Sequence, residues 1–593
     1  MRYLGIIGIV ASTGLISSLA FAEGPPVTHW NKVAVDVGRV LPSGPAIGPN
    51  SASRIVAIAQ LAVYEAVNSV VKSHEPYRAY IPTNGPVSLE AAVAQAAHDA
   101  LVTLQPSQAA TGANLDHELE TSLADIPDGT AKDNGVLLGS LAASSIVSLR
   151  INDGASATVA YPGSTDIGKW RPTVRNPEFT DPPTNSVVNP PLAASDPQWA
   201  DLKPFGILSS DQFRTGTGAV VVPPPALTSE AYAAAFNEVK ILGASNAPVT
   251  NPPTDPPTGR STEQTQIASF WAQQTHVPFN AIARSLSDAD ALSIADSARL
   301  FALLNIAIAD SRAAIWDAKY EYGFWRPVTA IRAAADDGND LTEANPTWNS
   351  FLDTPNHPES PSGHSGTGAA AAGILRTWFG DTRAISVASL TLTATVRNFP
   401  TFTAAAQENA DSRVYGGIHF RFSNNVGLAL GYELGNYVYT NLLKAVPPPS
   451  GEGGAGGEGG TAGEGSSGEG GSAGDEGGAS GEGGEAPGTG GSVGGSAGSS
   501  SAGRAGSSTG SAGEENEAGA SSGGSAGTAG GGGRAGAAGG GGRAGSGTRP
   551  PATPKDDEDC SCSIPGKPAS SSNAAWLVTL GLAALSRRRW LRG

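Results

Sequence analysis

The feature that most limits how this chain can fold is a low-complexity segment from residue 447 to residue 559. It consists almost entirely of Gly, Ser, Ala, Glu and Thr, a composition that cannot bury enough apolar surface to offset the entropy of folding. We predict a flexible acidic linker there and a folded region over residues 23–446. The linker has fifteen acidic and five basic residues, so it carries ten of the 17 net negative charges of the chain. Nothing in this charge distribution indicates nucleic-acid binding.

The N-terminal end has the composition of a targeting segment. Residues 1–22 contain one early basic residue, Arg2, then an apolar stretch and an Ala-Phe-Ala site directly before Glu23. This is the pattern of a secretory signal peptide. The mature chain is therefore expected to begin near Glu23.

The C-terminal end, residues 560–593, combines Cys560 and Cys562 with an apolar run over 574–585 and a basic cluster at 587–589. The run is short for a membrane span, which takes about 20 residues. The tail resembles the sorting signal of myxobacterial surface proteins, which implies a secreted protein anchored at the cell surface or outer membrane, with membrane contact only through this tail. The alternative is a poorly ordered tail with a marginal membrane helix.

The region between these ends is predicted to be all-α. Apolar residues recur at helical spacing in seven stretches, and no convincing alternating run predicts a strand. Two Pro-rich stretches, 176–192 and 221–257, are expected to be long loops. Ala-rich faces such as 369–372 permit close helix packing, so we expect helical bundles. The predicted helices are Arg54–Val71, Leu89–Leu104, Gly135–Ile151, Leu292–Lys319, Gly366–Phe379, Ala384–Val396 and Val426–Leu443.

Three short segments between residues 319 and 419 gather side chains that suit a tetrahedral oxyanion. The first has Lys319 and, seven residues on, Arg326 before a proline; the second is Pro-Ser-Gly-His at 361–364; the third has Arg413 and, six residues on, His419. An oxyanion needs fixed cations, hydroxyl and amide donors. The three segments together contain each of these groups.

Local sequence supports the same interpretation. Gly363 lets a backbone amide approach an anion closely, and the stretch after it is predicted to be a helix whose N-terminus faces that anion. The two glycines at 416–417 leave room for a turn that brings Arg413 and His419 to one site. The sequence thus predicts a single pocket built from three separate segments.

The order and spacing of these segments resemble the superfamily of vanadium-dependent haloperoxidases and type 2 phosphatidic acid phosphatases. The resemblance implies a helical-bundle fold of the haloperoxidase type and a vanadate cofactor. It implies that His419 bonds the metal and that His364 is the acid–base group, with Lys319 assisting catalysis. The residues implied to hold the oxygens of vanadate are Lys319, Arg326, Ser362, Gly363 and Arg413.

Two further residues favour the haloperoxidase branch. Trp316 lies three residues before Lys319, and His357 lies seven residues before His364; in the family these positions border the halide site. A histidine at 357 resembles the bromoperoxidases, so bromide is the favoured halide. The implied partners are hydrogen peroxide, halide and a small organic acceptor, and the oligomeric state is left open.

Two alternatives stay open. The first is a soluble, secreted acid phosphatase of the same superfamily that uses a phosphohistidine at His419. A membrane phosphatase would need several long apolar spans among its catalytic segments, and we expect none in the folded region. The second alternative is a surface-displayed binding protein that keeps the pocket without turnover.

One residue departs from the family pattern. Many relatives have an aspartate four residues after the last histidine, where it can orient the imidazole, but this chain has Ser423. We expect either weaker cofactor binding or help from another carboxylate, such as Asp411 or Asp310. The other five histidines show no metal-ligand spacing and are expected to be structural: His29, His74, His98, His117 and His276.

Overall fold

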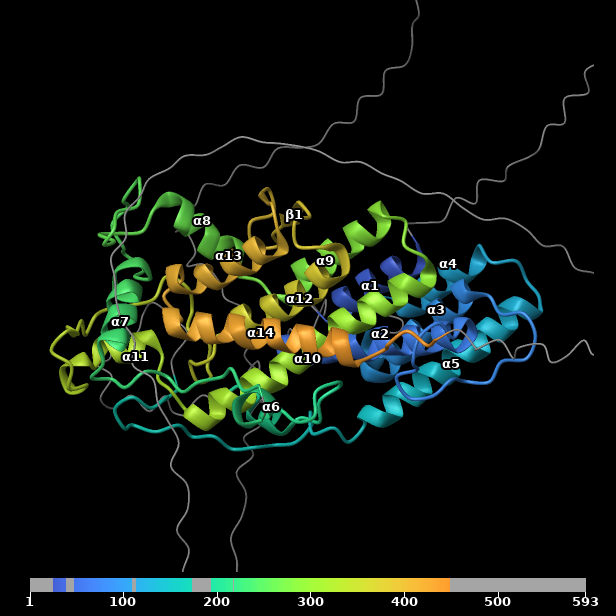
Figure 1. Ribbon diagram of the computed structural model, residues 1–593, viewed down its shortest axis with the longest axis horizontal. Helices are drawn as coiled ribbons and strands as arrows, with labels where there is room; N and C mark the ends of the chain where they lie inside the picture. The colour runs from blue at the N-terminus through green and yellow to red at the C-terminus, as the bar shows by residue number, and fades with distance from the viewer. Residues whose placement is uncertain (1–24, 39–46, 109–113, 173–193, 217, 448–593) are drawn as a thin grey trace, which may run out of the picture. The chain divides into compact units, whose positions relative to one another are not determined.

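Two long, buried helices, α2 (Pro49–Val71) and α10 (Ile294–Tyr322), pack against each other in the computed structural model (Figure 1). The structure describes residues 25–38, 47–108, 114–172, 194–216 and 218–447. The predicted signal peptide, the loop at 176–192, the acidic linker and the C-terminal tail lie outside these residues. Both helices consist mostly of Ala, Val, Ile and Leu, which bury apolar surface on all sides.

One bundle forms around α2. Its members are α1 (Pro26–Val37), α3 (Leu89–Leu104), α4 (Leu115–Ala124) and α5 (Thr130–Arg150). A one-turn 3₁₀ helix, η1 (Pro106–Gln108), follows α3. In Figure 1 the helices α3, α4 and α5 lie together at one end of the described part of the chain.

A second bundle forms around α10 and contains the three predicted pocket segments. In its core α10 packs against α12 (Gly363–Phe379) and α14 (Arg421–Asn441), and α13 (Phe402–Tyr415) packs against α12 and α14. Shorter elements surround them: η2 (Pro197–Asp201), α6 (Gln212–Thr215), α7 (Glu230–Leu242), α8 (Thr262–Phe270), α9 (His276–Ala289), α11 (Pro327–Arg332) and η3 (Ala334–Asp336).

The helical prediction is confirmed for the fold class and for six of the seven stretches, and five of these six have a shifted end. The prediction of a helix over Ala384–Val396 is wrong. This stretch forms an antiparallel hairpin of β1 (Ile385–Ala388) and β2 (Val396–Phe399), with Ile385 opposite Phe399. Buried and exposed residues alternate along β1, so the period is two rather than 3.6.

The prediction of one long loop over 221–257 is also wrong, because α7 occupies its middle. Ser229 caps this helix by accepting a hydrogen bond from the Tyr232 amide, and Tyr232, Phe236 and Val239 lie on its buried face. Prolines lie on both sides of α7, so the composition of the stretch indicated a loop and the helix between them was not predicted.

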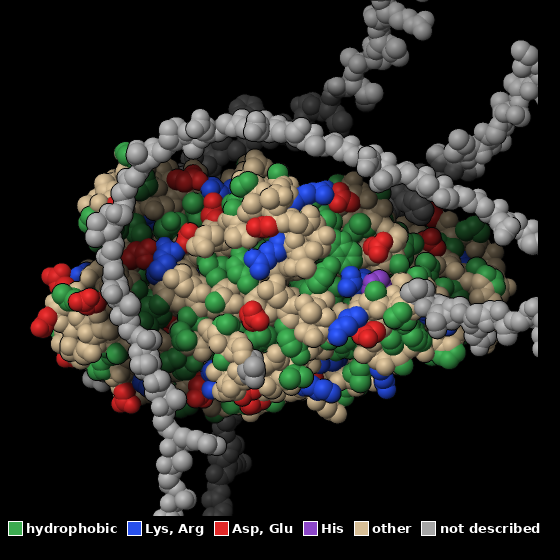
Figure 2. All heavy atoms as spheres, in the orientation of Figure 1, with side chains coloured by type: hydrophobic (Ala, Val, Ile, Leu, Met, Phe, Trp, Pro, Cys, Tyr) green, Lys and Arg blue, Asp and Glu red, His purple; other side chains and the backbone are tan. Residues whose placement is uncertain are grey.

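The helix α2 is long and apolar enough to cross a membrane by composition alone. However, 83% of its most apolar window is buried inside the bundle, so its apolar surface is already covered by protein. On the face drawn in Figure 2, Lys and Arg side chains lie interspersed with Asp and Glu.

Candidate functional site

The first pocket segment spans the end of α10 and the start of α11. Gly323 ends α10 in the left-handed conformation, with φ of 54°, and the chain turns so that Arg326 directly precedes α11. Lys319 Nζ donates to the carbonyl oxygens of Pro358 and Glu359 at 2.9 and 2.8 Å. Both cations are fully buried. The first segment is thereby fixed against the loop that precedes α12.

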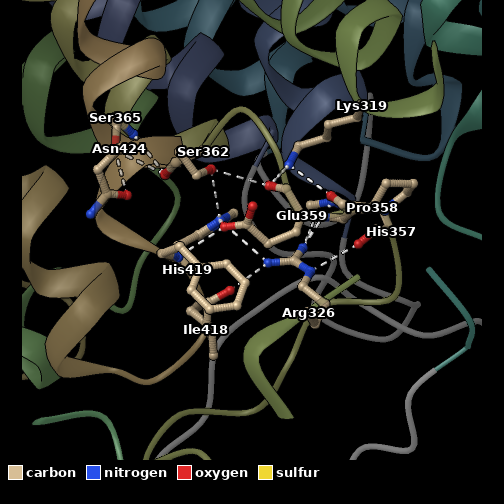
Figure 3. Close-up of polar contacts among 12 residues, drawn as sticks. Lys319, Arg326, His357, Pro358, Glu359, Ser362, Ser365, Ile418, His419 and Asn424 are labelled. Atoms are coloured by element: carbon tan, nitrogen blue, oxygen red, sulfur yellow. Dashed lines mark hydrogen bonds and ion pairs between the residues drawn. The ribbon is translucent and has the colours of Figure 1, made fainter. Parts of the chain in front are cut away.

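Arg326 links the first segment to the third segment and to the loop before α12 (Figure 3). Its Nε donates to the His357 carbonyl oxygen at 2.9 Å, and one terminal nitrogen donates to the Ile418 carbonyl oxygen at 2.8 Å. That same nitrogen lies 3.2 Å from Nε2 of His419. The guanidinium therefore faces the imidazole, as a single pocket requires.

The second segment forms the N-terminus of α12. Ser362 caps the helix, since its hydroxyl accepts from the Ser365 amide, and Gly363 is the first helical residue. A side chain at Gly363 would come within 3.4 Å of an Arg312 guanidinium nitrogen and 3.7 Å of the Trp316 ring. The glycine thus keeps a cationic recess open at a helix N-terminus, where amides point outward.

The third segment connects α13 to α14. Arg413 lies in the last turn of α13, is fully buried, and donates to the Trp271 carbonyl oxygen at 3.2 Å. Gly417 has φ of 78° and packs against Gly243 so closely that a side chain there would collide with backbone. The expected turn at 416–417 is present, and it places His419 beside Arg326.

The second ring nitrogen of His419 contacts a residue that the sequence analysis missed. Nδ1 lies 2.8 Å from Oε1 of Glu359, and the Phe420 amide donates to the same oxygen at 3.0 Å. Ser423 Oγ is 3.5 Å from Nδ1. Glu359 lies only five residues before His364. Its closeness in sequence to the second segment was the signal that could have indicated a place in the pocket.

The two carboxylates suggested from the sequence serve elsewhere. Asp310 accepts the backbone amides of Phe205, Gly206 and Ile207, and Asp411 forms an ion pair with Arg421. The expectation that one of them supports His419 is therefore wrong. Spacing along the chain did not reveal that the loop before α12 runs closer to the imidazole than α10 or α13.

The pocket keeps its three histidines neutral. Burial, followed by the positive charges of Arg326 and Lys319, holds the pKa of His419 well below its usual range, and the pKa of His357 is lowered in the same way. Burial and the charges of Arg413 and Arg312 lower the pKa of His364. Neutral rings next to several guanidinium groups indicate a strongly positive potential, which suits an anion.

His364 and the aromatic pair complete the cluster. His364 is partly exposed, and its Nε2 lies 3.0 Å from the Gln273 carbonyl oxygen. The rings of Trp316 and His357 are 4.8 Å apart, and His357 Nδ1 is 3.0 Å from a terminal nitrogen of Arg326. Trp316 and His357 therefore lie in the same cluster as the predicted oxyanion ligands.

Arg312 is a second residue that the sequence analysis missed. It lies two turns before Lys319 on α10, with Trp316 between them on the same face, and it is 2% exposed. The signal was available, because a basic residue recurring at helical spacing with Lys319 predicts a shared face.

Among the described residues no group of three or more His, Cys, Asp and Glu side chains could hold a metal ion.

Comparisons with known proteins agree with this architecture. Residues 26–205 match a model of the vanadium chloroperoxidase N-terminal domain, and residues 299–447 match a model of its second helical-bundle domain. A vanadium chloroperoxidase of Curvularia inaequalis is 24% identical over 67% of this chain and 78% of its own length.

Solved structures give the same result for the fold. A bacterial vanadium-dependent iodoperoxidase is 24% identical with a TM-score of 0.55, covering 71% of this chain and 96% of its own. A bacterial vanadium-dependent chloroperoxidase is 18% identical with a TM-score of 0.53, covering 69% of this chain and 95% of its own. The resemblance inferred from the three pocket segments is confirmed, and the chain belongs to the vanadium haloperoxidase family.

Proposed function

We propose that this protein is a vanadate-dependent haloperoxidase that oxidises halide with hydrogen peroxide to a hypohalous species. The observation that carries the proposal is the environment of His419. Its Nε2 faces Arg326 inside a buried cationic pocket, while its Nδ1 is bonded to Glu359. A neutral imidazole with one nitrogen turned toward an oxyanion site is the arrangement that metal ligation requires.

The residues of the pocket fit vanadate. Arg326 and Arg413 offer planar donor groups for oxygens, Lys319 offers a compact charge, and Gly363 offers a backbone amide at the start of α12. Ser362 adds a hydroxyl at the helix cap. In this proposal these five residues hold the oxygens of vanadate, and His419 binds the metal through Nε2.

The chain's own residues provide binding and proton transfer. When bound, vanadate supplies Lewis-acid activation of hydrogen peroxide without a change in the oxidation state of vanadium. His364 is the proposed proton-transfer group, and its ring is held in place by Nε2, which lies 3.0 Å from the Gln273 carbonyl oxygen. Its lowered pKa keeps it neutral and able to accept a proton. Lys319 and Arg326 stabilise negative charge in the pocket. The overall reaction combines hydrogen peroxide, halide and one proton into hypohalous acid and water.

Bromide is the proposed halide. The pair of Trp316 and His357 gives a polarisable wall beside the positive charges of Arg326 and Lys319. A soft anion suits such a wall, and the hypohalous product would then halogenate a small organic acceptor. The similar solved structures are those of an iodoperoxidase and a chloroperoxidase, and comparing bromide with iodide and chloride in the bromination assay tests the choice.

We further propose that the enzyme is secreted and held at the cell surface by its C-terminal tail. This rests on the composition of residues 1–22 and 560–593, as does the division of the chain at residues 446 and 559. Release of a reactive hypohalous species outside the cytoplasm is consistent with that placement.

The test uses purified protein loaded with vanadate. The wild type is expected to retain vanadium in elemental analysis and to brominate a phenol dye in the presence of bromide and hydrogen peroxide. His419→Ala is expected to lose the metal, and His364→Ala to keep the metal while losing roughly 100-fold or more in turnover. His117→Ala is the matched control, because this histidine is 65% exposed on α4.

Three outcomes would contradict the proposal. Equal vanadium in wild type and His419→Ala would remove the assignment of the metal ligand. Hydrolysis of para-nitrophenyl phosphate that vanadate inhibits, without bromination, would select the acid phosphatase alternative. Folded protein that is inactive in both assays would select the binding-protein alternative.

A further inference from the structure

We propose that Glu359 is a positioning residue that holds the proton of His419 on Nδ1 and so presents Nε2 as the metal-bonding nitrogen. The inference rests on the proposed vanadate site. It assigns a role to a residue that lies outside the three segments from which the pocket was predicted.

The two contacts of the imidazole fix where its proton lies. Arg326 can only donate hydrogen bonds, so Nε2, 3.2 Å from its terminal nitrogen, must be the acceptor. The proton is then on Nδ1, where Oε1 of Glu359 accepts it at 2.8 Å. A carboxylate on the far nitrogen of a ligating histidine orients the ring and raises its basicity.

The position of the Glu359 carboxylate is itself fixed. The Phe420 amide donates to Oε1 at 3.0 Å, so the residue that follows His419 holds the carboxylate that orients it. The loop that carries Glu359 is anchored in turn, because Lys319 donates to the Glu359 carbonyl oxygen at 2.8 Å. The carboxylate, the imidazole and the lysine therefore form one rigid unit.

Burial of this carboxylate is difficult to explain by stability alone. Glu359 is fully buried, and its Oε2 has no hydrogen-bond partner within the described part of the chain. A buried carboxyl group with one unsatisfied oxygen is costly, and burial raises the pKa of Glu359 to about 7. When it is ionised, its negative charge also opposes an anionic ligand. Such a group is retained where its hydrogen bond is needed, and here that bond goes to His419.

Ser423 explains why the task falls to Glu359. It lies one turn after His419 on α14, with its hydroxyl 3.5 Å from Nδ1 and 3.4 Å from the Glu359 carbonyl oxygen. At that distance the hydroxyl is a weak partner. Glu359 reaches the same nitrogen from the loop before α12 and supplies the charge that the hydroxyl lacks.

The test measures vanadate affinity by equilibrium dialysis on the full chain, without any assay of turnover. At a pH above the value of about 7 to which burial raises the pKa of Glu359, Glu359→Gln keeps the shape of the side chain and removes its charge. If Glu359 acted on vanadate only through its negative charge, Glu359→Gln would bind vanadate more tightly, because the carboxylate that repels the anion is gone. The positioning role predicts the opposite sign, a loss of about tenfold or more. Unchanged or tighter binding by Glu359→Gln would overturn the inference.

A second variant tests for rescue. In Glu359→Gln, the further change Ser423→Asp places a new carboxylate next to Nδ1, and at least part of the lost affinity is expected to return. A folded double variant that binds no better than Glu359→Gln would count against the inference. Glu65→Gln is the matched control, since Glu65 is a buried carboxylate on α2 that accepts backbone amides of residues 77–79. Its vanadate affinity should equal that of the wild type.

A spectroscopic measurement needs no variant of Glu359. In vanadate-free wild type labelled with ¹⁵N-histidine, the His419 ring is expected to carry its proton on Nδ1 and none on Nε2, with His419→Ala identifying the signal. A proton on Nε2 would refute the inference even if vanadate binds. If wild type binds no vanadate, the proposed function falls, while this measurement still decides the tautomer.

Discussion

At the scale of single residues, the site depends on cations that keep imidazoles neutral. The pKa values of His357, His364 and His419 are all lowered by burial and by neighbouring cations. These rings can therefore bond a metal or accept a proton near neutral pH without first losing one. The positive charge of the pocket comes from buried guanidinium groups and from the buried ammonium group of Lys319.

Arg312 gives a residue-scale prediction. It lies beside Gly363 and lowers the pKa of His364 and His357. Arg312→Gln is expected to weaken vanadate binding by about tenfold, the value of one charged hydrogen bond, and to raise the pKa of His364. Equilibrium dialysis and NMR titration of His364 measure the two effects.

The matched control for Arg312 removes a cation from another place in the same bundle. Arg376 lies in the last turn of α12, stacked on the ring of Tyr432. Arg376→Gln should leave both the vanadate affinity and the pKa of His364 unchanged. If the two variants behave alike, the effect is one of net charge and Arg312 has no specific role.

At the scale of elements, the site depends on the close approach of α12 and α14. Small residues recur every four positions on α14, at Gly427, Gly431 and Gly435. They face Ser362, Gly366 and Ala370 on α12 and its cap, and a side chain at any of them would press on backbone oxygens there. Backbone contact thus holds α12, which Ser362 caps, against α14, which begins two residues after His419.

Gly431→Ala tests this packing. An added methyl would collide with the Gly366 carbonyl oxygen and come within 2.7 Å of the Ala369 side chain. We expect a loss of about 1 to 3 kcal/mol in the free energy of unfolding, although alanine is the better helix former. The change in the free energy of unfolding is measured by denaturant unfolding. Asn436→Ala, at an exposed position of the same helix, should stabilise slightly; equal effects would show that the close contact is unimportant.

The elements also show what sequence could and could not predict. The pocket segments were found because they gather basic, hydroxyl and imidazole side chains in an order and spacing that resemble a known family. The helix α3 was predicted to the residue, since its period is unambiguous, whereas the other five confirmed helices differ from the prediction at one or both ends. The hairpin at 385–399 was missed because four-residue strands are too short to separate the two periods. The contact of Glu359 with His419 joins a loop to a turn 60 residues away, which no local pattern encodes.

At the scale of the whole described region, the two bundles are joined beyond the site by residues 442–446, which follow α14. The Glu75 amide donates to the Lys444 carbonyl oxygen at 2.7 Å, and the Val446 amide donates to the Ser73 carbonyl oxygen at 3.0 Å. The segment after α14 thereby pairs with the segment after α2. Arg299 of α10 also donates to the Leu443 carbonyl oxygen at 2.9 Å. The end of the second bundle is thus tied to the first bundle.

Two truncations separate this junction from the acidic linker. A chain that ends at Val446 keeps every one of these bonds. We therefore expect this truncated chain to have the same Tm and the same vanadate affinity as the full chain. A chain that ends at Asn441 loses them together with Leu443, which is 3% exposed. Loss of a buried leucine and of these bonds corresponds to about 2 to 4 kcal/mol, which should appear as a lower Tm in thermal unfolding. An equal Tm for the two truncated chains would show that the junction contributes nothing, and a Tm lowered already at Val446 would show that residues 447–593 stabilise the fold.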